Sequence, residues 1–161
     1  MAVTTAAGTV ISISPEGPAT YDSAGYAGSG MNWVVIGEIV DAGVHGRKYA
    51  EIMHKPIGSR GVQKFKGSFD EGTKTIQMAM DRTDAGQVIA KAASLSDSDY
   101  SFKVQYPPAP GQTVGPVDYF RAKVMTLETA ASNVDSLVNA TMQLSLTTNS
   151  AGVGVVAVAG S

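Results

Sequence analysis

Residues that could perform acid–base chemistry gather in the segment "KFKGSFDEGTKTIQMAM", residues 64–80. Asp70 and Glu71 stand side by side there, between Lys66 and Lys74. A general acid and a general base need surroundings that separate their pKa values. The pattern predicts a hairpin with both carboxylates at its solvated tip, where Gly72 can supply a positive φ. Because both carboxylates would then have the same solvated surroundings, a role in forming the turn is favoured over catalysis.

The second candidate site contains the two histidines, His45 and His54, with Asp41 and Glu51 nearby. Imidazole and carboxylate groups are ligands for zinc. Their spacing fits neither the i, i+4 pair of a helical zinc site nor a loop signature, so solvated loop histidines are favoured. The sequence has no G-x-S-x-G elbow and no Walker phosphate loop. We therefore expect no enzyme activity, no metal and no cofactor.

The composition excludes further classes of function. The 161 residues suit one domain, and 43% hydrophobic residues are enough for a packed core. A net charge of −2 argues against a general nucleic-acid-binding surface. The absence of Cys excludes disulfides and Cys-ligated zinc. Neither a signal peptide nor an apolar run of about 20 residues is present, so we expect folding in a cytoplasm.

The elements that would position these side chains are mainly strands. We expect a hairpin from 63–69 and 73–80, anchored by apolar side chains on one face, with Lys64, Lys66 and Lys74 on a solvated face. One short helix is expected over 81–94, where Asp84 and Gln87 resemble a capping box and Asp81 is an alternative start. Its apolar stripe would contain Ala85, Val88, Ile89 and Ala92. Further strands are predicted at 31–40, 99–106, 117–129 and 137–147.

The strand at 137–147 has the clearest alternation of the chain. Its apolar face would carry Val138, Ala140, Met142, Leu144 and Leu146, and its polar face Asn139, Thr141, Gln143, Ser145 and Thr147. Residues 41–61 form a long connection rich in Gly. We expect an N-terminal arm at 1–30, a β-domain at 31–148 and a flexible tail at 149–161.

The ordered set of segments resembles the major tail tube proteins of long, non-contractile-tailed bacteriophages. The likeness covers about residues 31–148 and is carried by four stretches: "WVVIGEIVDAG", "KFKGSFDEGTKTIQMAM", "DRTDAGQVIAKAA" and "YFRAKVMTLETAASNVDSLVNATMQLSLT". These proteins are similar in fold to the tubes of contractile tails and of type VI secretion. The resemblance implies a mainly β (α+β) chain with two packed antiparallel sheets, forming a sandwich or barrel, and one short flanking helix.

The resemblance also implies a structural role in the virion tail, after assembly in the cytoplasm of a bacterial host. Six copies would form a ring, and stacked rings would form a tube that conducts double-stranded DNA during ejection. Partners would be further copies of the chain and other tail proteins: a tape measure, a tail terminator and a tail tip. The candidates for contacts between subunits or rings are Lys55, Pro56, Arg60 and Lys64. The candidates for a surface facing the lumen are Asn139, Thr141, Gln143 and Ser145, whose face could equally point outward.

Two alternatives stay open at the level of sequence. A tail terminator or a secretion-tube subunit would share the same architecture. A closed β-barrel that binds a small apolar ligand is a different class, and it would be a monomer with an internal cavity.

Overall fold

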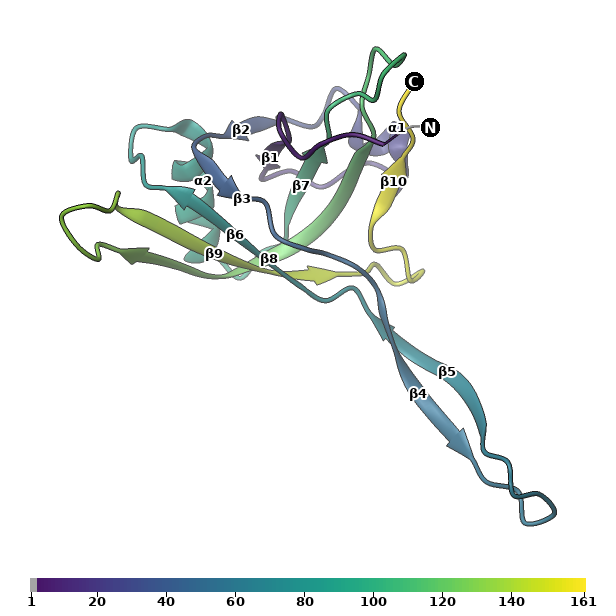
Figure 1. Cartoon of the computed structure of the whole chain (residues 1–161). Helices are drawn as coiled ribbons and strands as arrows, with labels where there is room; N and C mark the ends of the chain where they lie inside the picture. The colour runs from purple at the N-terminus through teal and green to yellow at the C-terminus, as the bar shows by residue number, and fades with distance from the viewer. Residues whose placement is uncertain (1–2) are drawn as a thin grey trace.

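The computed structural model describes residues 3–161, which form one large sheet and one small sheet (Figure 1). The large, eight-stranded sheet has the order β2-β1-β7-β8-β9-β6-β3, and β10 also pairs with β8. The small sheet is the pair β4-β5, and all pairs are antiparallel. The strands are β1 (Val10–Ser14), β2 (Val34–Ile36), β3 (Ile39–Asp41), β4 (Lys48–His54), β5 (Gln63–Asp70), β6 (Thr73–Ala79), β7 (Tyr100–Gln105), β8 (Val117–Ala130), β9 (Asn139–Thr147) and β10 (Val156–Val158). The helices are the single-turn α1 (Ser23–Tyr26) and α2 (Ala85–Ser94).

The prediction of a mainly β chain with two antiparallel sheets and a short flanking helix is confirmed. The expected packing into a sandwich or barrel differs from the structure. The large sheet is not closed into a barrel. The small sheet projects away from the large one, and all seven residues of β4 are exposed (Figure 1).

The two ends of the large sheet belong to one stretch of chain. The sequence predicts a single strand over 31–40, but the structure divides it into β2 and β3, which lie at opposite ends of the strand order. Gly37 and Glu38 join them, and Glu38 has a φ of 60°, which breaks the extended backbone. The sheet therefore curves back on itself, and a covalent link takes the place of the missing strand pairing.

The core lies inside this curve and is built from alternate residues of the strands. It includes Ile76 and Met78 of β6, Phe102 of β7, and the predicted apolar face of β9, where Ala140, Met142, Leu144 and Leu146 are buried. Phe102 and Phe120 stack with ring centroids 5.6 Å apart. A second, smaller cluster contains Tyr26, Val117 and Tyr119, with Trp33 packed against it.

Helix α2 begins at the predicted N-cap, but the Gln87 side chain accepts from the N–H of Asp81 and not, as in a full capping box, from that of Asp84. Asp84 is the N-cap, and its carboxylate accepts a hydrogen bond from the backbone N–H of Gln87 at 2.9 Å. The buried face differs from the predicted stripe, because it contains Gly86, Gln87, Ala90 and Ala93, while Val88 is exposed. Gly86 explains the rotation: a Cβ there would lie 2.3 Å from the carbonyl oxygen of Val35, so only glycine allows this contact with β2.

Both terminal segments contribute strands to the sheet. Within the expected arm of 1–30, β1 pairs with both β2 and β7, and Ile11 and Ile13 are buried in the core. Within the expected tail of 149–161, β10 pairs with the start of β8. The backbone of Ser161 exchanges hydrogen bonds with Val114 at 2.9 and 3.0 Å.

The predicted hairpin at 64–80 is wrong in its pairing. β5 pairs with β4, whereas β6 pairs with β3 and β9 in the large sheet. Glu71 and Gly72 are a link between two sheets, and the predicted long loop of 41–61 supplies the partner strand of β5. Alternation alone cannot distinguish these pairings, because it reports which residues share a face but not which strand lies alongside.

Candidate assembly surfaces

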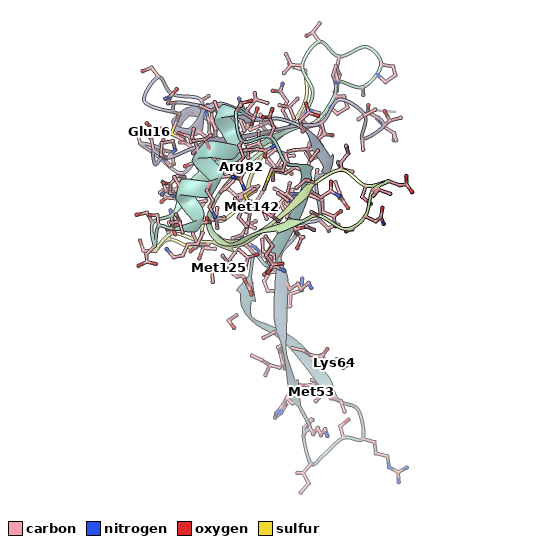
Figure 2. All side chains as sticks on the ribbon, turned by 90° about the vertical axis from the view of Figure 1, so that its left-hand side faces the viewer. Glu16, Met53, Lys64, Arg82, Met125 and Met142 are labelled. Atoms are coloured by element: carbon pink, nitrogen blue, oxygen red, sulfur yellow. The ribbon has the colours of Figure 1, made fainter. Side chains whose placement is uncertain are left out.

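The most unusual surface of the molecule is the β4–β5 pair with its connecting turn, residues 48–70, which we call the projecting hairpin. Figure 2 shows it extending from the body, with Met53 and Lys64 along its length. An isolated two-stranded hairpin is marginally stable in water at best. The residues of this one are almost entirely exposed, so its own body gives it little packing.

Apolar side chains lie on both faces of the projecting hairpin. On one face Ile52 pairs with Phe65, and these side chains are 52% and 54% exposed. On the other face Lys66 lies over the ring of Tyr49, with Nζ 4.7 Å from the centroid. Ile57 at the tip is fully exposed. Exposed apolar residues gathered on one element of this kind mark an interaction surface.

The base of the projecting hairpin is held by a buried polar network, which contains Lys74, His45, Asp118 and Tyr106. Lys74 Nζ lies 3.0 Å from His45 Nδ1, and His45 Nε2 lies 2.8 Å from Asp118 Oδ2. The Tyr106 hydroxyl donates a hydrogen bond to the same carboxylate oxygen at 3.0 Å. An ammonium group can only donate, so His45 accepts at Nδ1 and donates from Nε2 to Asp118. The network joins the chain just before β4 to strands β6 and β8.

Burial and the neighbouring groups both shift the pKa values of this network. Lys74 is 1% exposed, and its burial lowers the pKa of the ammonium group to about 8. Burial opposes the ionisation of Asp118, but hydrogen bonds from His45 and Tyr106 hold the pKa of this carboxyl below its ordinary value. Burial, together with the charge of Asp118, raises the pKa of Tyr106.

A second buried contact fixes the other side of the base. Glu71 is 3% exposed, and its carboxylate accepts a hydrogen bond from Nε of Arg47 at 2.7 Å. The Arg47 guanidinium also lies 3.8 Å from the centroid of the Phe69 ring. Arg47 and Glu71 flank the two ends of the projecting hairpin, so this pair closes its base.

These contacts correct two expectations from the sequence. Asp70 and Glu71 do not share one environment, because Asp70 is exposed and accepts from the N–H of Gly72, while Glu71 is buried against Arg47. Lys74 does not lie on a solvated face. Its position contained a signal for this, since Lys74 has the same parity as the buried Ile76 and Met78 of β6.

The structure separates the residues that could have formed a metal site. His45 is held by Lys74 and Asp118, whereas His54 lies exposed on β4 opposite Gln63. Glu51 lies near Lys64, with oxygen and nitrogen 3.7 Å apart. Within residues 3–161, no group of three or more His, Asp or Glu side chains could hold a metal ion. Neither helix in this range has the length and apolar character needed to cross a membrane.

The residues expected at subunit contacts fall on the projecting hairpin. Lys55, Pro56 and Arg60 lie in the turn between β4 and β5, and Lys64 lies in β5. All but Pro56, which is half-buried, are exposed. The structure thus brings these four residues together on one element.

The residues expected at a lumen lie on the outer face of the large sheet. Asn139, Thr141, Gln143 and Ser145 point away from the core, and across β6 they face Ala79, Gln77, Thr75 and Thr73. A β-bulge between Val124 and Thr126 shifts the register with β8, where Glu128 faces Thr141 and Lys123 faces Ser145. The Lys123 ammonium is paired with Asp99. This polar sheet face therefore consists mostly of uncharged amide and hydroxyl groups.

A groove of about 380 Å³ lies between α2 and the sheet. Its apolar lining includes Met78, Met80, Val88 and Leu127, and its charged lining includes Arg82 and Lys91. Because this groove is open at the surface, it is not the enclosed cavity that the ligand-binding β-barrel alternative requires.

No protein-family model matches the sequence, and no curated protein is similar to it in sequence. Several solved structures are similar in fold. A chain of the anti-feeding prophage (AFP) baseplate has a TM-score of 0.65 and 8% identity, covering 94% of this chain and 92% of that chain. The SPP1 tail tube protein has a TM-score of 0.63 and 14% identity, covering 95% of this chain and 77% of that one.

A third similar structure is the sheath/tube terminator of PVC, an extracellular contractile injection system, in its extended state. It has a TM-score of 0.64 and 8% identity, covering 98% of this chain and 97% of that chain. These three likenesses extend over nearly the whole of the described chain. The resemblance seen in the sequence is confirmed at the level of the fold: this chain has the fold found in phage tail tubes and contractile injection systems.

Proposed function

We propose that this chain is a structural subunit of a phage tail tube, which assembles with copies of itself into stacked six-membered rings. The observation that carries the proposal is the projecting hairpin, an element with exposed apolar side chains and little support from its own body. Such an element is stabilised when a neighbouring subunit covers it. The fold likeness to the SPP1 tail tube supports this role, and a similar chain comes from a sixfold-symmetrised baseplate.

The proposal assigns the polar sheet face to the lumen. A wall of uncharged amide and hydroxyl groups offers few cations to hold phosphates, so double-stranded DNA can pass without being retained. The tube would be assembled in the bacterial cytoplasm and become part of the virion tail. A tape measure, a terminator and a tail tip would be its partners, and its role would not be that of an enzyme.

A second candidate is a tube terminator, which closes one end of a tube. The likeness to the PVC sheath/tube terminator favours it, because almost the full length of both chains is covered. The two candidates differ in what purified protein forms: a tube subunit continues to stack, whereas a terminator stops at a single ring.

The proposal is tested by removing the projecting hairpin. Lys48 and Asp70 are paired across its base, so a Gly-Gly turn in place of residues 48–70 can reconnect Arg47 to Glu71. The buried core lies outside the deletion, so we expect a folded monomer by circular dichroism and sedimentation. The full chain, concentrated and viewed by negative-stain electron microscopy, should form hollow tubes, and the deletion variant should form none. Tubes from the deletion variant, or a full chain that stays monomeric, would contradict the proposal.

A further inference from the structure

The charges of this chain are divided between two parts of the molecule. The projecting hairpin carries two acidic residues, Glu51 and Asp70, and five cationic ones: Lys48, Lys55, Arg60, Lys64 and Lys66. Its net charge is therefore +3. Because the whole chain carries −2, all the remaining residues together carry −5.

The projecting hairpin and the acidic residues lie at opposite ends of β6. The hairpin joins β6 at Thr73 through the link of Glu71 and Gly72. The far end of β6, at Ala79, is about 20 Å away at the usual rise per residue of a strand. Figure 1 shows the hairpin extending from one end of the large sheet, with the β8–β9 loop at the other.

Several acidic residues surround the far end of β6. The carbonyl of Glu38 accepts from the N–H of Ala79 at 2.9 Å, and the carbonyl of Val138 accepts from the N–H of Met80 at 2.8 Å. These bonds bring the β2–β3 link and the β8–β9 loop together at this end. The acidic residues there are Glu38, Asp81, Asp84, Glu128 and Asp135, and the neighbouring cations are Arg82 and Lys91.

This end of the sheet is also apolar. Val40, Val134, Leu137 and Val138 are exposed there, and Val134 is 99% exposed. We call these residues, with the acidic ones, the acidic sheet end. The projecting hairpin pairs exposed apolar residues with positive charge, and the acidic sheet end pairs them with negative charge. The two surfaces thus share exposed apolar residues and carry opposite charges.

We propose that the projecting hairpin of one copy docks against the acidic sheet end of a second copy, so that opposite charges set the direction of assembly. The two surfaces are different and lie about one strand length apart, so the contact is head-to-tail. A head-to-tail contact either closes into a ring or continues as a stack. This inference rests on the proposed self-assembly and names the surface that receives the hairpin.

Charge reversal tests the inference. The first variant, Lys55→Glu with Arg60→Glu, makes the hairpin net negative. The second, Glu128→Lys with Asp135→Lys, changes the net charge of the acidic sheet end, counted with the neighbouring Arg82 and Lys91, from −3 to +1. All four side chains are exposed and none forms a hydrogen bond or ion pair within residues 3–161, so both variants should fold like the wild type. We expect each variant alone to assemble only at a concentration raised at least about tenfold, since like charges would then meet.

The chain that carries all four substitutions gives the decisive result. Its hairpin is negative and its sheet end positive, so attraction returns, and we expect assembly near the wild-type concentration. The matched control compares two single substitutions, Glu128→Lys and Asp97→Lys. Asp97 is an exposed acidic residue in the loop after α2. Only Glu128→Lys should hinder assembly. Wild-type assembly should also weaken from about 50 mM to about 500 mM NaCl, because salt screens exposed charges.

The outcomes separate the inference from the proposed function. If the wild type assembles and both two-residue variants assemble equally well, the inference is wrong and the proposed function stands. If the two-residue variants fail and the four-residue variant also fails, the pairing of these two surfaces is wrong. A wild type that forms no assembly at any concentration overturns the proposed function itself. Tubes are scored by negative-stain microscopy, and the concentration dependence by light scattering.

Discussion

The ammonium nitrogen of Lys74 lies 3.0 Å from Nδ1 of His45, at the point where the projecting hairpin leaves the large sheet. A cation buried this deeply depends on its neighbours, which are His45 from the chain before β4 and the carboxylates of Asp118 on β8 and Asp41 on β3. A polar contact inside the sheet therefore holds the chain that leads into the hairpin against β6.

The stability of the monomer should rise with pH between about 8 and 10. Burial lowers the pKa of Lys74 from 10.5 to about 8, so in this window the unfolded chain binds a proton that the folded chain has released. Stability then increases with pH by at most about 1.4 kcal/mol per pH unit. Above this window, ionisation of tyrosines in the unfolded chain acts in the opposite direction, since burial raises the pKa of Tyr26 to about 12.

Urea unfolding of the monomeric hairpin-deletion chain at pH 8, 9 and 10 measures this slope, with Lys74→Met in the same background as control. The variant should lose the part of the slope that Lys74 supplies and keep the part from Lys103, whose pKa is also lowered by burial. Equal slopes in both chains would show that Lys74 is not the group that titrates.

The substitution His45→Ala should destabilise the monomer by about 1–3 kcal/mol, because it leaves Lys74 and Asp118 buried with one hydrogen-bond partner fewer each. Chemical denaturation measures the loss. His54→Ala is the matched control, since His54 is exposed on β4, and should stay within about 0.5 kcal/mol of the wild type. Equal losses at both histidines would contradict the role given to the network.

The substitution Asp84→Ala should lower the free energy of unfolding by about 1–2 kcal/mol, the upper part of the range for the loss of a helix N-cap. Asp84 also accepts a hydrogen bond from the N–H of Gly37 at 3.1 Å, so it holds α2 to the link between β2 and β3. Thermal unfolding, monitored by circular dichroism, measures this loss of stability. Asp81→Ala serves as control, because that carboxylate accepts hydrogen bonds from Thr83 within its own turn. A larger loss at Asp81 than at Asp84 would refute this account.

The double substitution Ile52→Ser with Phe65→Ser should leave the body of the monomer folded and prevent assembly. The two side chains pair on one face of the hairpin and are about half exposed, so they bury little area in the monomer. The melting temperature of the body and the yield of tubes are the two measurements. Val114→Ser, at an exposed apolar residue in the loop before β8, should still form tubes. Normal tubes from the double variant would exclude the hairpin face from the contact.

The double substitution Thr141→Arg with Gln143→Arg should slow DNA ejection if the polar sheet face lines the lumen. Two arginines in each copy add cations that hold phosphates as DNA passes. Ejection from phage carrying the variant measures the effect, with Thr141→Glu and Gln143→Glu as the control of opposite charge. An ejection rate that the arginines do not change would place this face outside the lumen.

Much of the fold could be predicted from alternation. The apolar and polar faces of β9 follow from the sequence, because each strand residue points to the side opposite its neighbour. The same holds for β7, where Phe102 and Val104 are buried. The N-cap at Asp84 also followed from local sequence, since a capping box needs only residues within one turn.

The pairing of the strands could not be predicted, because it depends on contacts distant in sequence. β5 was expected beside β6, and it lies beside β4 instead. The break at Glu38 was missed, since a glutamate with positive φ has no distinctive local pattern. The charges of the buried network were misjudged for a related reason. Lys74 shares the parity of the buried Ile76 and Met78, but a lysine is not expected inside a sheet unless its partners are known. Those partners, His45 and Asp118, lie 29 residues before it and 44 residues after it.

The link between the projecting hairpin and β6 has a mechanical consequence. In Figure 1 the hairpin and β6 run along nearly one line, joined by Glu71 and Gly72. The hydrogen bonds from β6 to β9 and β3 run across that line, because antiparallel ladders are perpendicular to their strands. A pull along the hairpin therefore loads these bonds in shear, all at once, and does not peel them apart singly. If neighbouring copies hold the hairpin, tension along the assembly passes directly into β6 and, through its hydrogen bonds, into β9 and β3.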